Sequence, residues 1–141
     1  MKNVIIIILV AAILLLSGFL FFTLSKNKTQ PSIALGLKVN EGGGLSIEAV
    51  PIDFSASKPV KLQIDFTTHQ GDLNFDLTKI SYLLDDKNNK YVPVSWDGGN
   101  GGHHLSGALL FSKPIRDTKT MIFIIENVYN VEKREFIWEI E

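Results

Sequence analysis

The sequence predicts an all-β domain, an antiparallel immunoglobulin-like β-sandwich of seven to nine short strands, preceded by one N-terminal transmembrane helix. Period-two alternation of apolar and polar residues dominates from residue 32 onward, and no stretch there has a convincing 3.6-residue pattern. Short strands recur between turn-forming residues, as in antiparallel sandwiches. An uncharged apolar run fills residues 4–24. An open barrel is the alternative fold, and "immunoglobulin-like" refers to architecture only, because the chain has no cysteine.

The apolar run VIIIILVAAILLLSGFLFFTL contains no charge, no proline and one glycine. As a helix it would be about 31 Å long, which matches the hydrocarbon core of a bilayer. A cleaved signal peptide is the rival interpretation, but its apolar core has about 7–15 residues and is followed by small residues. Bulky residues from Phe19 to Phe22 occupy that place here. We therefore expect an uncleaved signal-anchor.

This interpretation divides the chain into four parts. Residues 1–3 are a short cytoplasmic N-terminus, residues 4–24 the transmembrane helix, residues 25–32 a polar linker and residues 33–141 an extracytoplasmic β-sandwich domain. Lysines flank both ends of the run, so the positive-inside rule is close to a tie. The three-residue tail resembles the n-region of an export signal, which favours an inside N-terminus. We expect a single-pass protein of the cell membrane whose domain lies outside the cytoplasm.

Composition excludes several classes of function. The chain carries 14 Lys/Arg and 15 Asp/Glu. Lys2 lies before the apolar run, so the part beyond Leu24 carries 13 Lys/Arg and 15 Asp/Glu, a net charge of −2. No basic stripe supports nucleic-acid binding. The absence of cysteine excludes disulfides, thiolate nucleophiles and Cys-ligated zinc. Roughly 110 residues beyond the linker suffice for one sandwich core and are too few for a second enzyme domain.

The first half of the domain predicts three strands. Residues 33–39 alternate, Glu41–Gly44 form a turn, and Leu45 and Ile47 resume the alternation, which predicts a first hairpin. Pro51 ends or kinks its second strand. The clearest strand is VKLQIDF, residues 60–66, whose apolar and polar residues face opposite sides. A strand with one wet face is typical of an antiparallel sheet.

The second half predicts further short strands. Residues 73–77 place Leu73, Phe75 and Leu77 on one face, and residues 80–84 are another apolar strand. Asp85–Lys90 is a turn by composition, and its acidic pair is best explained as solvated rather than as a Ca²⁺ site, because the spacing D-x-D-x-D-G is missing. In residues 91–96, the alternation of Val92, Val94 and Trp96 favours core packing for the tryptophan.

Three segments complete the pattern. Residues 97–104, DGGNGGHH, predict a glycine-rich loop, and residues 105–111 predict the strand that follows it. Residues 120–125 are apolar on both faces, which indicates a central strand. The last strand carries Phe136, Trp138 and Ile140 on one face.

All three histidines fall in two polar loop segments. His69 lies in TTHQGD, and His103 and His104 end the glycine-rich loop. Imidazole is the commonest neutral metal ligand, and three imidazoles suit Zn²⁺ or Cu²⁺. Asp72 and Asp97 lie in the same segments and could complete a site or orient an imidazole. The three histidines are therefore the candidate metal ligands, with Asp72 and Asp97 as auxiliaries.

A structural explanation of the histidines stands beside the metal site. Adjacent residues of a regular strand point to opposite faces, so His103 and His104 share one ion only where the backbone is irregular. Their spacing lacks the specificity of H-E-x-x-H. Imidazoles can also bond the exposed backbone of a glycine-rich loop, or form part of a binding surface. The residues alone leave both interpretations open.

No catalytic arrangement is visible in the sequence. Nothing pairs a nucleophile with a base or two carboxylates with each other, and the serines lack a G-x-S-x-G context. We expect a non-catalytic, membrane-anchored binding module with a protein or small-ligand partner outside the cytoplasm. The alternative is a protein that binds divalent Zn or Cu through its loop histidines.

Residues 66–138 also resemble a family of uncharacterised exported domains in prokaryotes. The resemblance rests on these features: Thr68-His69 before Asp72-Leu73 and Asp76-Leu77; Leu84-x-Asp86; Pro93 and Trp96; Gly101-Gly102-His103-His104; Gly107, Leu109 and Phe111; and Arg134-x-Phe136-x-Trp138. The GGHH block after Trp96 is the most specific of them. The resemblance implies one domain with functional loops at the same places, and no activity.

Overall fold

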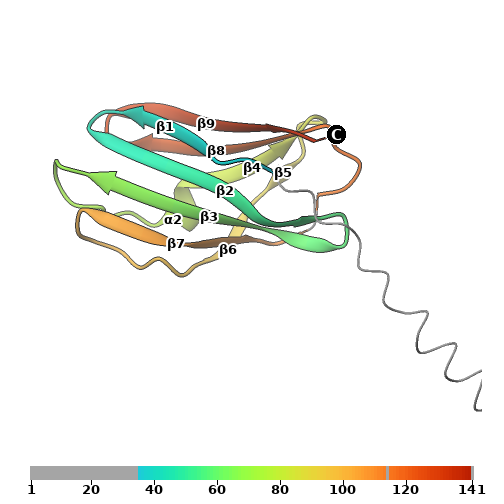
Figure 1. The fold of residues 1–141 in the computed structure, drawn as a ribbon, viewed down its shortest axis with the longest axis horizontal. Helices are drawn as coiled ribbons and strands as arrows, with labels where there is room; N and C mark the ends of the chain where they lie inside the picture. Colours follow the sequence, from blue (N-terminus) through green and yellow to red (C-terminus); the bar gives the residue numbers. More distant parts are fainter. Residues whose placement is uncertain (1–34, 114, 141) are drawn as a thin grey trace, which may run out of the picture. The chain divides into compact units, whose positions relative to one another are not determined.

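The computed structural model describes residues 35–113 and 115–140, which form a sandwich of two antiparallel sheets (Figure 1). The chain divides into two units, Met1–Gln30 and Pro31–Glu141, and the described residues belong to the second. The expected transmembrane helix at residues 4–24 and the linker at residues 25–32 lie outside the described residues. Of the helical residues that are described, none belongs to a helix long and apolar enough to cross a membrane.

The two sheets contain five and four strands. The strands are β1 (Lys38–Gly42), β2 (Leu45–Ser55), β3 (Lys58–Thr68), β4 (Ser81–Asp85), β5 (Lys90–Tyr91), β6 (Pro93–Trp96), β7 (His104–Phe111), β8 (Thr120–Val128) and β9 (Val131–Glu139), with one short helix, α2 (Leu77–Ile80). Their order is β1-β2-β3-β7-β6 in one sheet and β5-β4-β8-β9 in the other. The predicted all-β antiparallel sandwich is confirmed at this level.

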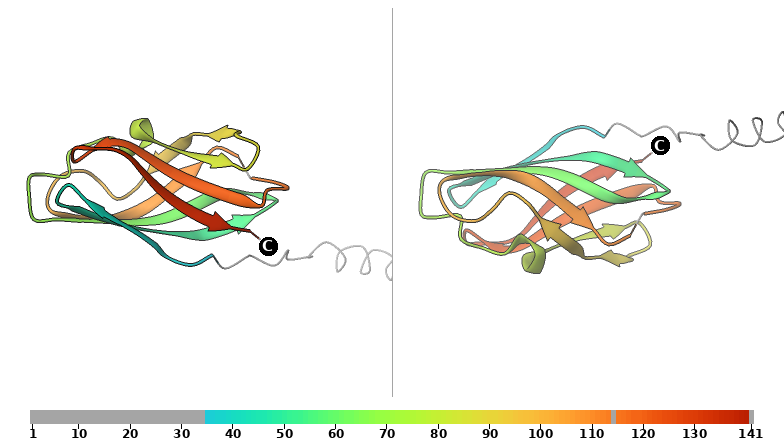
Figure 2. Two further views of the ribbon diagram at one scale, coloured as in Figure 1. Left: turned by 90° about the horizontal axis from the view of Figure 1, so that it is seen from above. Right: turned by 90° about the horizontal axis from the view of Figure 1, so that it is seen from below.

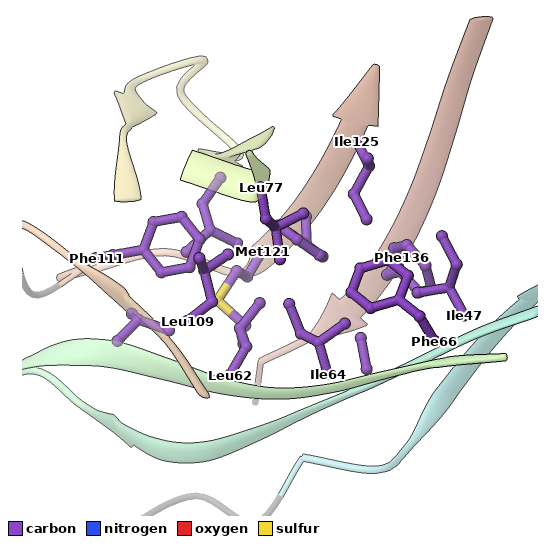
Figure 3. Packing of buried hydrophobic residues seen from close by; sticks show 14 of the residues in the cluster. Ile47, Leu62, Ile64, Phe66, Leu77, Leu109, Phe111, Met121, Ile125 and Phe136 are labelled. Carbon is purple, nitrogen blue, oxygen red and sulfur yellow. The ribbon is translucent and has the colours of Figure 1, made fainter. Parts of the chain in front are cut away.

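The period-two pattern fills the space between the sheets. In β3 the predicted apolar face is buried, from Val60 to Phe66, while the polar residues between them are partly exposed. The central strand β8 contributes Met121, Phe123 and Ile125 from the facing sheet. These side chains belong to one cluster, in which Figure 3 shows Leu62, Ile64 and Met121. Each fully buried side chain of this size contributes about 1.5–3 kcal/mol.

The predicted strand at residues 73–77 is wrong. Residues 72–76 have no regular structure, and α2 begins at Leu77. Asp76 caps this helix, because its carboxylate accepts hydrogen bonds from the Thr78 amide at 3.1 Å and the Thr78 hydroxyl at 2.6 Å. The Thr78 hydrogen bonds hold the pKa of Asp76 below its ordinary value. Leu73 and Leu77 are nevertheless buried, and Figure 3 shows Leu77 pointing into the core.

Irregular pairing changes two other expectations. β2 continues through Pro51, with a register shift before Asp53, so the proline kinks the strand and does not end it. The pairing of β6 with β7 also has a register shift, between Pro93 and Ser95. This extra residue places Pro93 and Trp96 toward the core and leaves Val92 and Val94 about half exposed. The expected shared face of Val92, Val94 and Trp96 is therefore wrong, although Trp96 does pack against the core.

Asp85 is buried, contrary to the expected solvated turn. It is 3% exposed and accepts hydrogen bonds from the Lys87 amide (2.9 Å), the Asn89 amide and side chain (both 2.8 Å) and the Tyr91 hydroxyl (3.0 Å). Burial alone would raise the pKa of Asp85, but the hydrogen bonds outweigh it and lower the pKa. The carboxylate therefore organises the β4–β5 turn.

The edge strands β1 and β9 belong to different sheets and are joined through side chains. Arg134 of β9 is fully buried and donates to the Asn40 side chain at 2.9 Å and the Gly42 carbonyl at 2.8 Å. Trp138 donates its indole N–H to the Gly36 carbonyl at 2.6 Å. Burial lowers the pKa of the Arg134 guanidinium, which stays charged in proteins. These bonds close one side of the sandwich.

The β1–β2 turn also contacts the β8–β9 turn. Gly43 has a φ of +58°, and a Cβ atom on it would lie 1.9 Å from the Tyr129 carbonyl oxygen. Only glycine fits there, because both the backbone conformation and the space exclude a side chain.

Asn40→Ala should lower the free energy of unfolding by about 1–3 kcal/mol, because it removes an acceptor from a buried guanidinium. Urea unfolding of the full chain in detergent micelles, followed by tryptophan fluorescence, measures the loss. Asn74→Ala, at an exposed position, is the control and should change stability by less than about 0.5 kcal/mol. Equal effects of the two substitutions would contradict the role of Asn40.

Gly43→Ala should destabilise the domain by roughly 2–4 kcal/mol, through left-handed backbone strain and overlap with Tyr129. The same urea titration measures it. Gly36→Ala is the matched control, since nothing lies within 4 Å of a Cβ atom at Gly36. A Gly43→Ala protein as stable as the control would show that the two turns are not in contact.

Candidate binding surface at the distal end

Strand pairing collects four connections at one end of the sandwich. Gly42 pairs with Leu45, Leu45 with Thr68 and Thr67 with His104, so the β1–β2 turn and the ends of β3 and β7 lie together. The β8–β9 turn joins them through its contact with Gly43. We call this the distal end, because β1 begins and β9 ends at the opposite, proximal end (Figures 1 and 2).

The glycine-rich segment runs beside the segment that follows β3. The Thr68 amide donates to the His103 carbonyl at 2.9 Å, and the Leu73 amide donates to the Gly102 carbonyl at 2.9 Å. In return the Gly101 amide donates to the Leu73 carbonyl at 2.8 Å. The two polar segments that carry the histidines are thus hydrogen-bonded to each other.

Asp72 and Asp97 hold this loop in place. The Asp72 carboxylate accepts a hydrogen bond from the Gly102 amide, and the Asp97 carboxylate accepts one from the Ala108 amide of β7. Each of these bonds involves a charged acceptor, so it is stronger than a neutral one. The geometry therefore supports a structural role for both carboxylates.

Trp96 anchors the beginning of the same loop. Its indole N–H donates to the Gly99 carbonyl at 2.8 Å, and its ring packs edge-on against Phe66, with 6.1 Å between centroids. Gly98 lies so close to the Trp96 ring that a Cβ atom would approach it to 2.1 Å. A Cβ atom on Gly107 would lie 2.3 Å from the Gly98 backbone. The glycines therefore allow the loop to follow the edge of β7 closely.

All three histidines are exposed on this braced loop structure. The His104 Nδ1 atom lies 3.3 Å from the Thr67 hydroxyl, on the outer face of the five-stranded sheet. His69 lines a shallow depression of about 440 Å³. The depression is lined by Glu41, Gly42, Gly44, Leu45, Ser46, Thr67 and His69.

Two polar residues near this end are buried, which was not expected from the sequence. Thr68 is 1% exposed, and its hydroxyl lies 2.8 Å from the Gly44 carbonyl and accepts from the Gln70 amide at 3.1 Å. Arg134 is the other. Both continue the alternation of buried positions in their strands, which is the signal that could have found them.

The candidate metal site stays a prediction. The structure describes His69, Asp72, Asp97, His103 and His104, and it assigns the two carboxylates to backbone amides. Across residues 35–113 and 115–140, no group of three or more His, Asp or Glu side chains is placed to hold an ion. What the distal end offers instead is a fixed, polar surface with exposed imidazoles.

Asp72→Ala should loosen the glycine-rich loop, because the Gly102 amide loses its charged acceptor. The expected result is faster hydrogen exchange of the Gly101 and Gly102 amides and a stability loss of about 1.5–3 kcal/mol. Hydrogen exchange with mass spectrometry on the full chain measures this. Asp65→Ala, on the outer face of β3, is the control and should leave loop protection unchanged. Unchanged exchange in Asp72→Ala would refute the bracing role.

Comparison with protein-family models, with curated proteins and with solved structures finds no match to this chain.

Proposed function

We propose that this chain is a non-catalytic, membrane-anchored binding module that faces outside the cytoplasm and engages a positively charged partner through its distal end. The sandwich has an immunoglobulin-like architecture, in which loops at one end commonly bind. The observation that carries the proposal is the distal end itself. Its loops are braced by charged hydrogen bonds, and they present His69, His103 and His104 to solvent.

Rigidity is the first support for binding. A loop already fixed by its own hydrogen bonds loses little conformational entropy when a partner binds. The bonds made by Asp72, Asp97 and Trp96 keep the loop in one conformation without using the imidazoles for that purpose, apart from the contact between His104 and Thr67.

Charge indicates the kind of partner. The connections at residues 69–76 and 97–103 carry Asp72, Asp76 and Asp97 and contain no Lys or Arg, although Asp76 is paired with Lys79 of α2 at 3.0 Å. Glu41 and Glu132 stand beside them on the ends of β1 and β9. A surface of this sign attracts basic protein segments or cationic ligands and repels acidic ones.

Membrane attachment is supported by the apolar run at residues 4–24, which is long enough to span a bilayer. β1 begins at Lys38, at the end opposite the β1–β2 turn, so attachment through the residues before β1 would leave the distal end accessible. The resemblance to exported prokaryotic domains belongs to the same proposal. Its most specific residues, Gly101 to His104, lie in the loop that we assign to binding.

Single-cysteine labelling tests location and binding together, because the natural chain has no cysteine. Asn100→Cys reports on the distal loop, and Ile137→Cys, on the exposed face of β9, is the control. We expect a membrane-impermeant maleimide to label both in intact cells. The quantity measured is the ratio of the labelling rate of Asn100→Cys to that of Ile137→Cys. We expect this rate ratio to be several-fold lower in cells than in the purified chain.

Salt provides the second arm of this experiment. At about 1 M salt the Debye length falls to roughly 3 Å, so a partner held by charge should leave and Asn100→Cys should regain its rate. Labelling only after cells are permeabilised would overturn the location. Equal rate ratios in cells and in the purified chain would overturn binding at the distal end.

A further inference from the structure

Charge is distributed unequally between the two ends of the domain. The proximal end contains the connections β2–β3, β4–β5 and β7–β8. Their described residues carry four cations, Lys87, Lys113, Arg116 and Lys119, and two carboxylates, Asp86 and Asp117. A fifth cation, Lys58 at the start of β3, is paired with Asp53 of β2. The connections of the distal end have the opposite sign. The domain is therefore positive near residue 35 and negative at the far end.

The basic connections are held together by hydrogen bonds. The Arg116 Nε atom donates to the Ala56 carbonyl at 2.8 Å, which joins the β7–β8 loop to the β2–β3 turn. The Lys87 Nζ atom donates to the Asp117 carbonyl at 2.7 Å, and the Thr118 hydroxyl donates to Asp86 at 2.6 Å. Three separate connections thus form one fixed basic surface.

These cations are poorly neutralised. Among the described residues, one of these five cations forms an ion pair. Lys58 lies 3.6 Å from the carboxylate of Asp53. Both side chains are largely exposed, so this pair contributes little and can exchange partners. The surface keeps an excess of positive charge for an external anion.

Two apolar side chains are exposed in the same half of the domain as the basic surface. Leu37, just before β1, and Ile52, in the kink of β2, are each 52% exposed. Ile52 lies beside Asp53, which pairs with Lys61 of β3. Exposed apolar groups beside lysines are typical of surfaces that rest at a membrane interface, where the charge meets headgroups and the apolar side chain enters the acyl boundary.

We infer that the proximal end is a lipid-facing surface that rests on an anionic bilayer. This inference rests on the membrane attachment in the proposed function, since the run at residues 4–24 and the ten residues 25–34 precede Leu35. Ten residues reach at most about 35 Å, so the proximal end stays near the bilayer. Charge complementarity then favours anionic phospholipid headgroups as the occupant.

Both ends of the domain favour the same orientation. Anionic headgroups attract the five cations, and they repel the carboxylates at the distal end. Attraction falls off within about 8–10 Å at physiological salt, so only the cations that face the bilayer count. Since Lys58 is offset by Asp53, the excess is two cations, which corresponds to roughly a thirtyfold change in the ratio of docked to undocked domain.

The test uses the full chain in nanodiscs of phosphatidylcholine, or of an equal mixture of phosphatidylcholine and phosphatidylglycerol. An environment-sensitive fluorophore on Ser57→Cys, in the β2–β3 turn, reports on contact with lipid. We expect a blue shift and brighter emission in the anionic discs, both reversed by high salt. The same fluorophore on Asn100→Cys, at the distal end, should not respond to lipid.

Charge reversal identifies the surface. Lys113→Glu with Lys119→Glu should abolish the lipid response of the Ser57→Cys probe. Lys79→Glu with Lys133→Glu changes the net charge equally, in the half of the domain nearer the distal end, and should leave the response intact. Urea midpoints of the two double variants verify that both are folded.

The outcomes separate this inference from the proposed function. If the chain co-elutes with both kinds of disc but the emission of the Ser57→Cys fluorophore is the same in each, the lipid-facing surface is wrong, while the membrane anchor is supported. If the control variant loses the response as well, the basic connections are not the site. If the chain fails to co-elute with discs, the anchor is wrong, and the inference falls with it.

Discussion

The side-chain connection between β1 and β9 is the constraint on which much of this domain depends. These strands are edges of different sheets and share no backbone ladder. Arg134 and Trp138 bridge them by donating to oxygens of β1 and the residues beside it. The buried guanidinium has only neutral acceptors among the described residues, so its desolvation is offset by geometry and not by an opposite charge. This makes the first hairpin a fixed part of the sandwich, and the hairpin turn in turn supports the distal loops.

The alternation of apolar and polar residues was sufficient to predict the sandwich. In a strand every second side chain lies on the same face, so the buried positions follow from the sequence pattern. It failed where one residue breaks the period. The register shift before Ser95 moved Trp96 to the face of Pro93, and the Asp76 cap turned an expected strand into α2. Neither event has a signal in hydrophobicity, because a bulge and a cap both depend on particular hydrogen bonds. Arg134 fits the buried pattern, but its charge argues against burial unless the acceptors on β1 are known.

The location of the candidate site was predictable, and its construction was not. Gly-rich and histidine-bearing segments indicated functional loops, and the structure brings residues 101–103 beside residues 68–73. What the sequence could not reveal is that Asp72 and Asp97 bond to backbone amides, since that depends on which distant residues meet. The same carboxylates could have faced a metal ion in another arrangement. The charge difference between the ends likewise appears only once the connections are sorted by the fold.

The direction of β1 determines how the domain responds to mechanical load. β1 runs from the proximal end toward the distal end and is hydrogen-bonded to β2 along its whole length. A pull through residue 35 against a partner held at the distal loops acts along the strand, while the ladder bonds lie across it. The bonds of this hairpin are then sheared together and are not opened one after another, with Arg134 and Trp138 adding lateral attachments. Under such a load, the geometry of β1 favours shearing of the β1–β2 ladder over unzipping from the first strand.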